Sequence, residues 1–111
     1  MATLVLNELT CNQTEDNAGS DECELRIWCD SRFFTMRKDL TNGETWPLNG
    51  WSQPFERRVK IQLWDLDNPG FPLYDDHDRL GTAIVYPDVT SDGQASFNED
   101  GSDYELHYEV R

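Results

Sequence analysis

Two short acidic windows hold the residues of this sequence that are best suited to chemistry. The first window covers residues 15–24 (EDNAGSDECE) and the second covers residues 65–78 (DLDNPGFPLYDDHD), and each contains five carboxylates. Carboxylates crowded in this way repel one another, so a bound cation would stabilise the folded loops. Ca²⁺ takes about six to eight oxygen ligands and tolerates irregular geometry, which makes it the ion that suits such loops best.

Asp65 and Asp67 are the strongest single indication of a metal site. They lie two positions apart at the end of an expected strand, so both side chains point to the same side and only Leu66 turns the other way. The calcium loop of helix-loop-helix proteins is rejected, because an alignment from Asp65 fails at Pro69 and the flanks resemble strands. A simpler interpretation stays open, especially for the first window. The two windows could be ordinary solvated loops, in which Asp, Asn and Gly are common.

Length and charge exclude several other classes of function. The chain has 111 residues, the size of one domain over residues 1–111, and its 22 acidic and 9 basic residues give a net charge of −13. Nucleic acid is excluded as a partner because it requires a cationic footprint. An anionic membrane would repel the chain as a whole. We expect no membrane-spanning segment, since no run of about 18 apolar residues occurs, and no signal peptide is visible after Met1.

The sequence contains no recognisable catalytic motif. It has no nucleophile elbow, no phosphate-binding Gly loop and no Ser or Cys with a His at a known spacing, so we expect no enzymatic activity. It also lacks a Cys/His cluster of the kind that binds structural zinc. Cys11 and Cys23 flank the first acidic window, where a disulfide and free buried thiols are both compatible with the sequence.

Hydrophobic residues recur at every second position along most of the chain, which predicts half-buried antiparallel strands. Strands are expected over residues 3–10, 23–29, 32–37, 57–64, 82–86, 94–97 and 104–110. Their inward faces should bury Leu25, Ile27, Val59, Ile61, Leu63, Leu106 and Val110. Pro and Gly interrupt the rest of the chain, and no stretch has a convincing helical period. Seven or eight short strands in one domain predict an all-β fold, an antiparallel β-sandwich.

The second acidic window and the strand before it resemble the C2 (C-two) domain family, the calcium-dependent β-sandwich modules of protein kinase C and synaptotagmin type. The segment VKIQLWDLD over residues 59–67 is followed by a loop that ends in DRLGTA over residues 78–83. In that family the third calcium loop carries Asp-x-Asp after a strand and closes with Asp-x-x-Gly. The corresponding residues here are Asp65, Asp67, Asp78 and Gly81.

The first acidic window is similar to the first calcium loop of the same family, which carries Asp, Gly and then Ser-Asp at the start of a strand. The corresponding residues are Asp16, Gly19, Ser20 and Asp21. Small bacterial C2-like modules are the nearer analogue. Residues 38–56 depart from the family pattern, and Glu22-Cys23 stands where the family has Pro-Tyr.

The resemblance implies that the two loops meet at one end of the sandwich and share one to three Ca²⁺ ions. It implies the side-chain ligands Asp16, Asp21, Asp65, Asp67 and Asp78. Asp76 is a further candidate, because the pair Asp75-Asp76 is additional to the family pattern. Five carboxylates, completed by backbone carbonyls and water, are enough for about two ions.

The leading hypothesis is a non-enzymatic calcium-binding module, in which Ca²⁺ stabilises the structure or permits contact with a partner. Two or three Ca²⁺ ions would leave a net charge of about −9 to −7, so a protein partner is favoured over membrane lipid. The alternative is an acidic inhibitor or immunity-type protein that binds a basic protein without metal, steered by its charge. Carboxylates gathered at one end favour the first hypothesis, and a broad acidic face favours the second.

Overall fold

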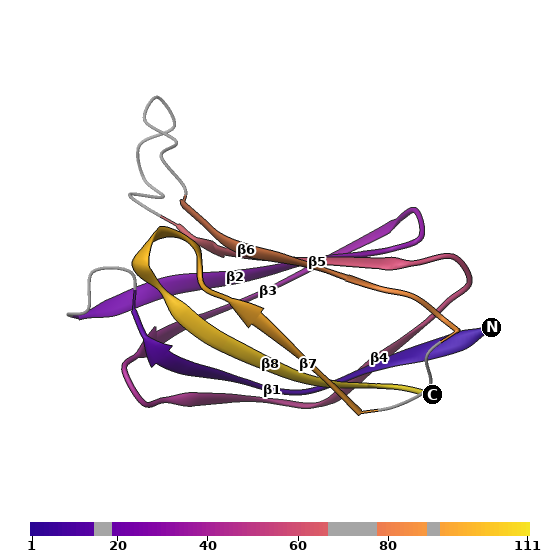
Figure 1. The fold of residues 1–111 in the computed structure, drawn as a ribbon, viewed down its shortest axis with the longest axis horizontal. Helices are drawn as coiled ribbons and strands as arrows, with labels where there is room; N and C mark the ends of the chain where they lie inside the picture. Colours follow the sequence, from indigo (N-terminus) through magenta and orange to yellow (C-terminus); the bar gives the residue numbers. More distant parts are fainter. Residues whose placement is uncertain (15–18, 67–77, 89–91) are drawn as a thin grey trace.

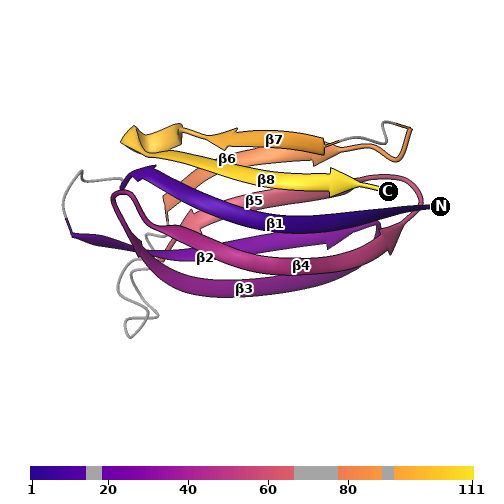
Figure 2. The same ribbon diagram turned by 90° about the horizontal axis from the view of Figure 1, so that it is seen from below.

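Two antiparallel sheets pack face to face as a β-sandwich (Figure 1; Figure 2). The structure is a computed structural model that describes residues 1–14, 19–66, 78–88 and 92–111. Its strands are β1 (Ala2–Gln13), β2 (Ser20–Cys29), β3 (Arg32–Thr41), β4 (Thr45–Phe55), β5 (Val59–Asp65), β6 (Asp78–Val85), β7 (Asp92–Phe97) and β8 (Asp103–Val110). One sheet has the order β4-β1-β8-β7 and the other has the order β3-β2-β5-β6. The predicted all-β sandwich is confirmed.

The core lies between the sheets and is built from the alternating residues that the sequence indicates. All seven residues predicted to be buried are buried, and Tyr104, Phe97 and Phe55 are the largest side chains with almost no exposure. Buried and exposed residues alternate along a strand because its successive side chains point to opposite faces of the sheet. Within the described residues the one helical element is the 3-10 turn Glu99–Gly101, so no helix is long and apolar enough to cross a membrane.

Strand β4 was not expected, because Pro47, Gly50 and Pro54 interrupt its sequence. It is an edge strand that pairs only with β1, and an edge tolerates proline because one side of the strand makes no ladder hydrogen bonds. The register of β1 and β4 shifts between Leu6 and Glu8, and Asn49 and Gly50 have φ of 57° and 73° in the opposing segment. Two residues with left-handed backbone conformation at a β-bulge therefore allow this Pro/Gly-rich segment to continue as a strand.

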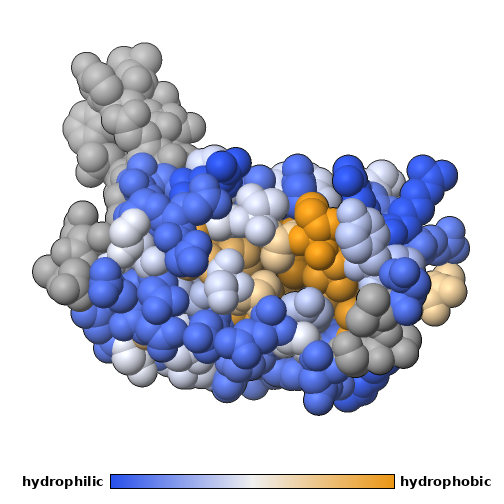
Figure 3. Space-filling view, viewed as in Figure 1, coloured by the Kyte–Doolittle hydropathy of each residue, from blue (hydrophilic) through white to orange (hydrophobic). Residues whose placement is uncertain are grey.

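The edge strands β6 and β7 approach each other closely across the sandwich at Gly81. A Cβ atom at Gly81 would lie 2.6 Å from Cδ1 of Phe97. Close packing against Phe97 therefore explains why a glycine occupies this position of the Asp-x-x-Gly motif. The face in Figure 3 is mostly hydrophilic, and an apolar strip lies in its middle part. Ile84 of β6, 39% exposed, is the large exposed aliphatic residue of this edge.

The sheet registers bring the ends of five strands to one end of the sandwich, which lies at the left in Figure 1. In one sheet Cys23 near the start of β2 pairs with Asp65 at the end of β5, and Asp65 pairs with Asp78 at the start of β6. In the other sheet Cys11 near the end of β1 pairs with Tyr104 near the start of β8. The described residues that border the two acidic windows therefore lie next to one another.

Candidate metal site

Three of the six predicted ligands lie in the described part of the chain. Asp21 is the second residue of β2, Asp65 is the last of β5 and Asp78 is the first of β6. The other three, Asp16, Asp67 and Asp76, lie outside the described residues. The structure therefore shows the position of one predicted ligand from the first window and of two from the second.

Asp65 joins the two windows directly. It is only 6% exposed, and its Oδ1 accepts a hydrogen bond of 3.0 Å from the backbone N–H of Glu22 in the first window. The backbone N–H of Leu66 in turn donates to the carbonyl oxygen of Glu22 at 2.9 Å. These two bonds fix the end of β5 against the start of β2, the two strand ends that border the acidic windows.

Asp21 is tied to the opposite sheet. It is 3% exposed, and its Oδ2 accepts a hydrogen bond of 2.6 Å from the hydroxyl of Tyr104 in β8. The Tyr104 hydroxyl also accepts a hydrogen bond of 3.4 Å from the thiol of Cys23. The sequence alone did not reveal the contact of Tyr104 with Asp21. The available signal was an inward-facing tyrosine, whose polar hydroxyl needs a partner when it is buried.

Carboxylates at this end of the molecule influence two buried thiols, Cys23 and Cys11. Burial raises the pKa of the Cys23 thiol to about 12, and the carboxylates of Asp21 and Asp65 act in the same direction. Burial also raises the pKa of Cys11, with further contributions from Asp21, Glu44 and Asp103. Both thiols are therefore protonated at neutral pH. Both are free, which decides against the disulfide and for free buried cysteines.

The donors at this end fit a hard cation. The described candidates supply carboxylate oxygens, the ligand type that Ca²⁺ prefers, and a negative field favours any cation. Within the described ranges, no three side chains from His, Cys, Asp and Glu are arranged to hold an ion by themselves. A complete site would therefore need ligands from the predicted set Asp16, Asp67 and Asp76.

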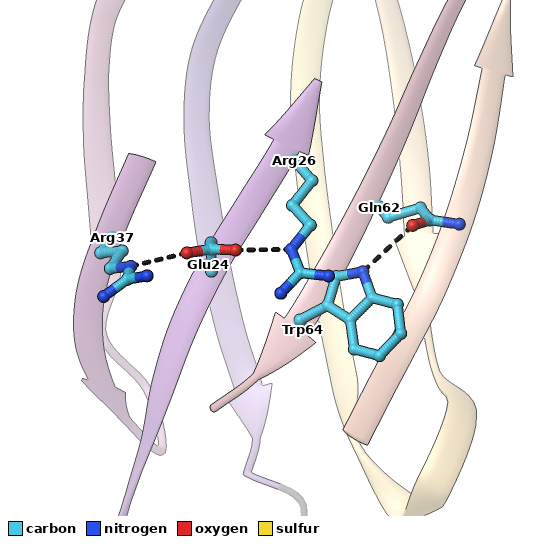
Figure 4. Close-up of polar contacts among 5 residues, drawn as sticks. All are labelled: Glu24, Arg26, Arg37, Gln62 and Trp64. Atoms are coloured by element: carbon cyan, nitrogen blue, oxygen red, sulfur yellow. Dashed lines mark hydrogen bonds and ion pairs between the residues drawn. The ribbon is translucent and has the colours of Figure 1, made fainter. Parts of the chain in front are cut away.

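Glu24 belongs to the first acidic window but faces the outer side of the β3-β2-β5-β6 sheet. Although it is only 3% exposed, it forms ion pairs with Nε of Arg26 and, at 2.6 Å, with Nε of Arg37 (Figure 4). The guanidinium of Arg26 also lies 4.5 Å from the ring centroid of Trp64. Burial alone would raise the pKa of Glu24, but the hydrogen bonds from the two arginines outweigh burial and hold the pKa below 4.5. The Glu24 carboxylate therefore neutralises two arginines on the outer face of this sheet.

We expect Glu24→Gln to lower the free energy of unfolding by about 1–2 kcal/mol at pH 7, because two arginines lose a shared buried partner. The pKa of Glu24 is depressed on folding, so its contribution is complete above pH 4.5 and is lost as the pH falls through the folded-state pKa. Urea unfolding of parent and variant should therefore differ at pH 7, and the difference should shrink as the pH falls below 4.5.

The matched control is Glu99→Gln, which removes the more exposed ion pair between Glu99 and Arg79. Its cost should stay below about 0.5 kcal/mol at both pH values. A difference between parent and Glu24→Gln that stays constant down to pH 3 would contradict the assignment to the charge of Glu24.

A hollow of about 430 Å³ lies at the opposite end of the sandwich, lined by Asp30, Ser31, Arg57 and Arg58. Asp30 lies in the turn between β2 and β3. Its carboxylate accepts backbone hydrogen bonds from Glu56, Arg57 and Arg58, and its own φ is 56°. These bonds join the β2–β3 turn to the β4–β5 turn, and they explain why the pKa of Asp30 is lowered.

Comparisons with known proteins agree on the fold. No protein-family model matches the sequence, and no curated protein matches it. Among solved structures, one described as the structure of a C2 domain has a TM-score of 0.62 at 14% identity and covers 99% of this chain and 98% of its own. A C2 domain of plant extended synaptotagmin 1 has a TM-score of 0.60 at 10% identity, over 98% and 90% of the two chains. Human GIVD cytosolic phospholipase A2 has a TM-score of 0.58 at 13% identity and covers 98% of this chain but only 16% of its own.

The chain therefore has the fold of a C2 domain. The resemblance that the sequence indicates is confirmed at the level of the fold, by structural likeness over almost the whole chain.

Proposed function

We propose that this protein is a non-enzymatic calcium-binding module of C2-like fold, in which Asp-rich residues of both windows hold Ca²⁺ at one end of the sandwich. The observation that carries the proposal is the junction at Asp65. There, β5 pairs with β2 and β6, and the backbone of Glu22 donates a hydrogen bond to the Asp65 carboxylate. A cation between the windows would relieve the repulsion among the carboxylates of the two windows.

The burial of two of the carboxylates supports the same proposal. Asp21 and Asp65 are almost inaccessible to water, and the bonds described above that reach them come from neutral donors, a tyrosine hydroxyl and a backbone amide. A nearby cation stabilises a buried carboxylate, so a bound Ca²⁺ beside Asp21 and Asp65 would favour their charged forms.

The alternative, an acidic inhibitor of a basic partner, would use a broad acidic face. The outer face of the β3-β2-β5-β6 sheet instead carries Arg26, Arg37 and Lys60 around the buried Glu24. Lys60 Nζ lies 4.3 Å from the ring centroid of Trp28 on the same face. The outer face of this sheet is therefore mixed in charge and is not the broad acidic face that the alternative would need.

Calcium would serve to stabilise the module or to bring it to a partner. A protein is the favoured partner, because the chain stays strongly acidic with two or three ions bound. Sedimentation with phosphatidylserine vesicles, with and without Ca²⁺, separates the cases. Calcium-dependent sedimentation would point to lipid, and its absence would leave structural stabilisation or a protein partner.

Isothermal titration calorimetry tests the proposal. Ca²⁺ should produce saturable heat with a dissociation constant in the micromolar to millimolar range, and Mg²⁺ should bind more weakly because it gives up its water reluctantly. The parent should be freed of metal by chelator and dialysis first. Absence of Ca²⁺ binding at millimolar concentration would contradict the proposal and favour the inhibitor alternative.

A further inference from the structure

A chain of buried hydrogen bonds links the core of the sandwich to Asp21. Tyr104 has no exposed surface, and its hydroxyl donates to Asp21 Oδ2 at 2.6 Å while it accepts from the Cys23 thiol at 3.4 Å. The Cys23 thiol thus occupies the accepting side of the hydroxyl, and the proton of the hydroxyl is directed at Asp21.

This hydrogen bond crosses the sandwich. Tyr104 belongs to β8 in one sheet, and Asp21 belongs to β2 in the other. Both side chains are held by packed strands, and a hydrogen bond to a charged group is strong where water is excluded. The direction of the Asp21 carboxylate is therefore coupled to the core of the sandwich.

Burial, the largest cause, and the hydrogen bond to Asp21 raise the pKa of Tyr104 far above its usual range, so the hydroxyl keeps its proton at neutral pH.

We propose that Tyr104 is a positioning residue for the calcium site, which orients the carboxylate of Asp21 by holding Oδ2. This inference rests on the proposed function. In metal sites, groups that hydrogen-bond to the ligands and fix their orientation typically change affinity by about 10–100-fold when they are removed. Tyr104 has the burial, the donor and the short contact that this role requires.

The test is the calcium affinity of Tyr104→Phe, measured by calorimetry at a temperature where circular dichroism shows the variant to be folded. We expect at least about tenfold weaker binding than in the parent. The matched control is Tyr108→Phe, on the same strand and half-buried, where the affinity should be unchanged. Parent-like affinity in Tyr104→Phe, with binding intact in the parent, would overturn this inference alone. A parent that binds no Ca²⁺ would refute the proposed function and this inference with it.

A double-mutant cycle separates positioning from general packing. If Tyr104 acts through Asp21, then Tyr104→Phe should not weaken calcium binding further in an Asp21→Asn background. A purely structural role predicts the same fold-loss in both backgrounds, which would contradict positioning. The double variant also keeps the test available if Tyr104→Phe alone folds poorly, because it leaves no buried charge without its donor.

Discussion

Saturating Ca²⁺ should raise the melting temperature of this protein by about 10 °C, and excess chelator should reverse the change. A ligand that binds only the folded state stabilises it by about 2.7 kcal/mol at a hundredfold excess over its dissociation constant. In a domain of this size each kcal/mol corresponds to several degrees. The measurement is a thermal melt by circular dichroism with Ca²⁺, with Mg²⁺ and with chelator.

Mg²⁺ is the control ion in this experiment, since it carries the same charge but prefers a tighter octahedral shell that keeps several waters. A smaller shift with Mg²⁺ than with Ca²⁺ would show that coordination, and not ionic strength, stabilises the fold. Identical melting curves with millimolar Ca²⁺ and with chelator would contradict the proposed function.

Asp67→Asn should weaken calcium binding by at least about tenfold. Asp67 follows Asp65 by two positions in the Asp-x-Asp step, and Asn keeps the size and one carbonyl oxygen but removes the charge. Ca²⁺ affinity depends on the number of charged ligands, so the variant tests charge and not packing. Calorimetric titration of parent and variant is the measurement.

Asp92→Asn is the control for Asp67→Asn. Asp92 is an exposed residue at the start of β7, so its replacement should leave the affinity unchanged. Asp30 does not serve as a second control, because its carboxylate holds three backbone amides and Asp30→Asn would lower stability. Parent affinity in Asp67→Asn would mean that the second window is not a metal site, even though the fold is that of a C2 domain.

Most of the fold could be predicted from alternation alone. The inward residues of β2, β5 and β8 are apolar at every second position, and a half-buried strand requires this pattern. Strand β4 could not be found in the same way, because Pro47, Gly50 and Pro54 interrupt it. Its place at a sheet edge, where proline is tolerated, is a property of the topology and not of the local sequence.

The candidate site could be predicted in part. The acids of the second window stand out in the sequence, and β5 does end at Asp65 beside β2 and β6. What the sequence could not show is which side each carboxylate faces. Glu24 lies in the first window but pairs with Arg26 and Arg37 on the outer face. The bond from Tyr104 to Asp21 joins residues that are 83 positions apart, and only the packing of the two sheets reveals it.

The central claim is that Ca²⁺ binds between the two acidic windows, and residue-resolved nuclear magnetic resonance tests it most directly. Titration of the ¹⁵N-labelled, metal-free protein with Ca²⁺ should shift the amides that border the windows, among them Asp21, Glu22, Leu66 and Arg79. The amides of Asp30 and Arg58, at the opposite end, should stay in place. Shifts confined to that opposite end, or no shifts at millimolar Ca²⁺, would contradict the account.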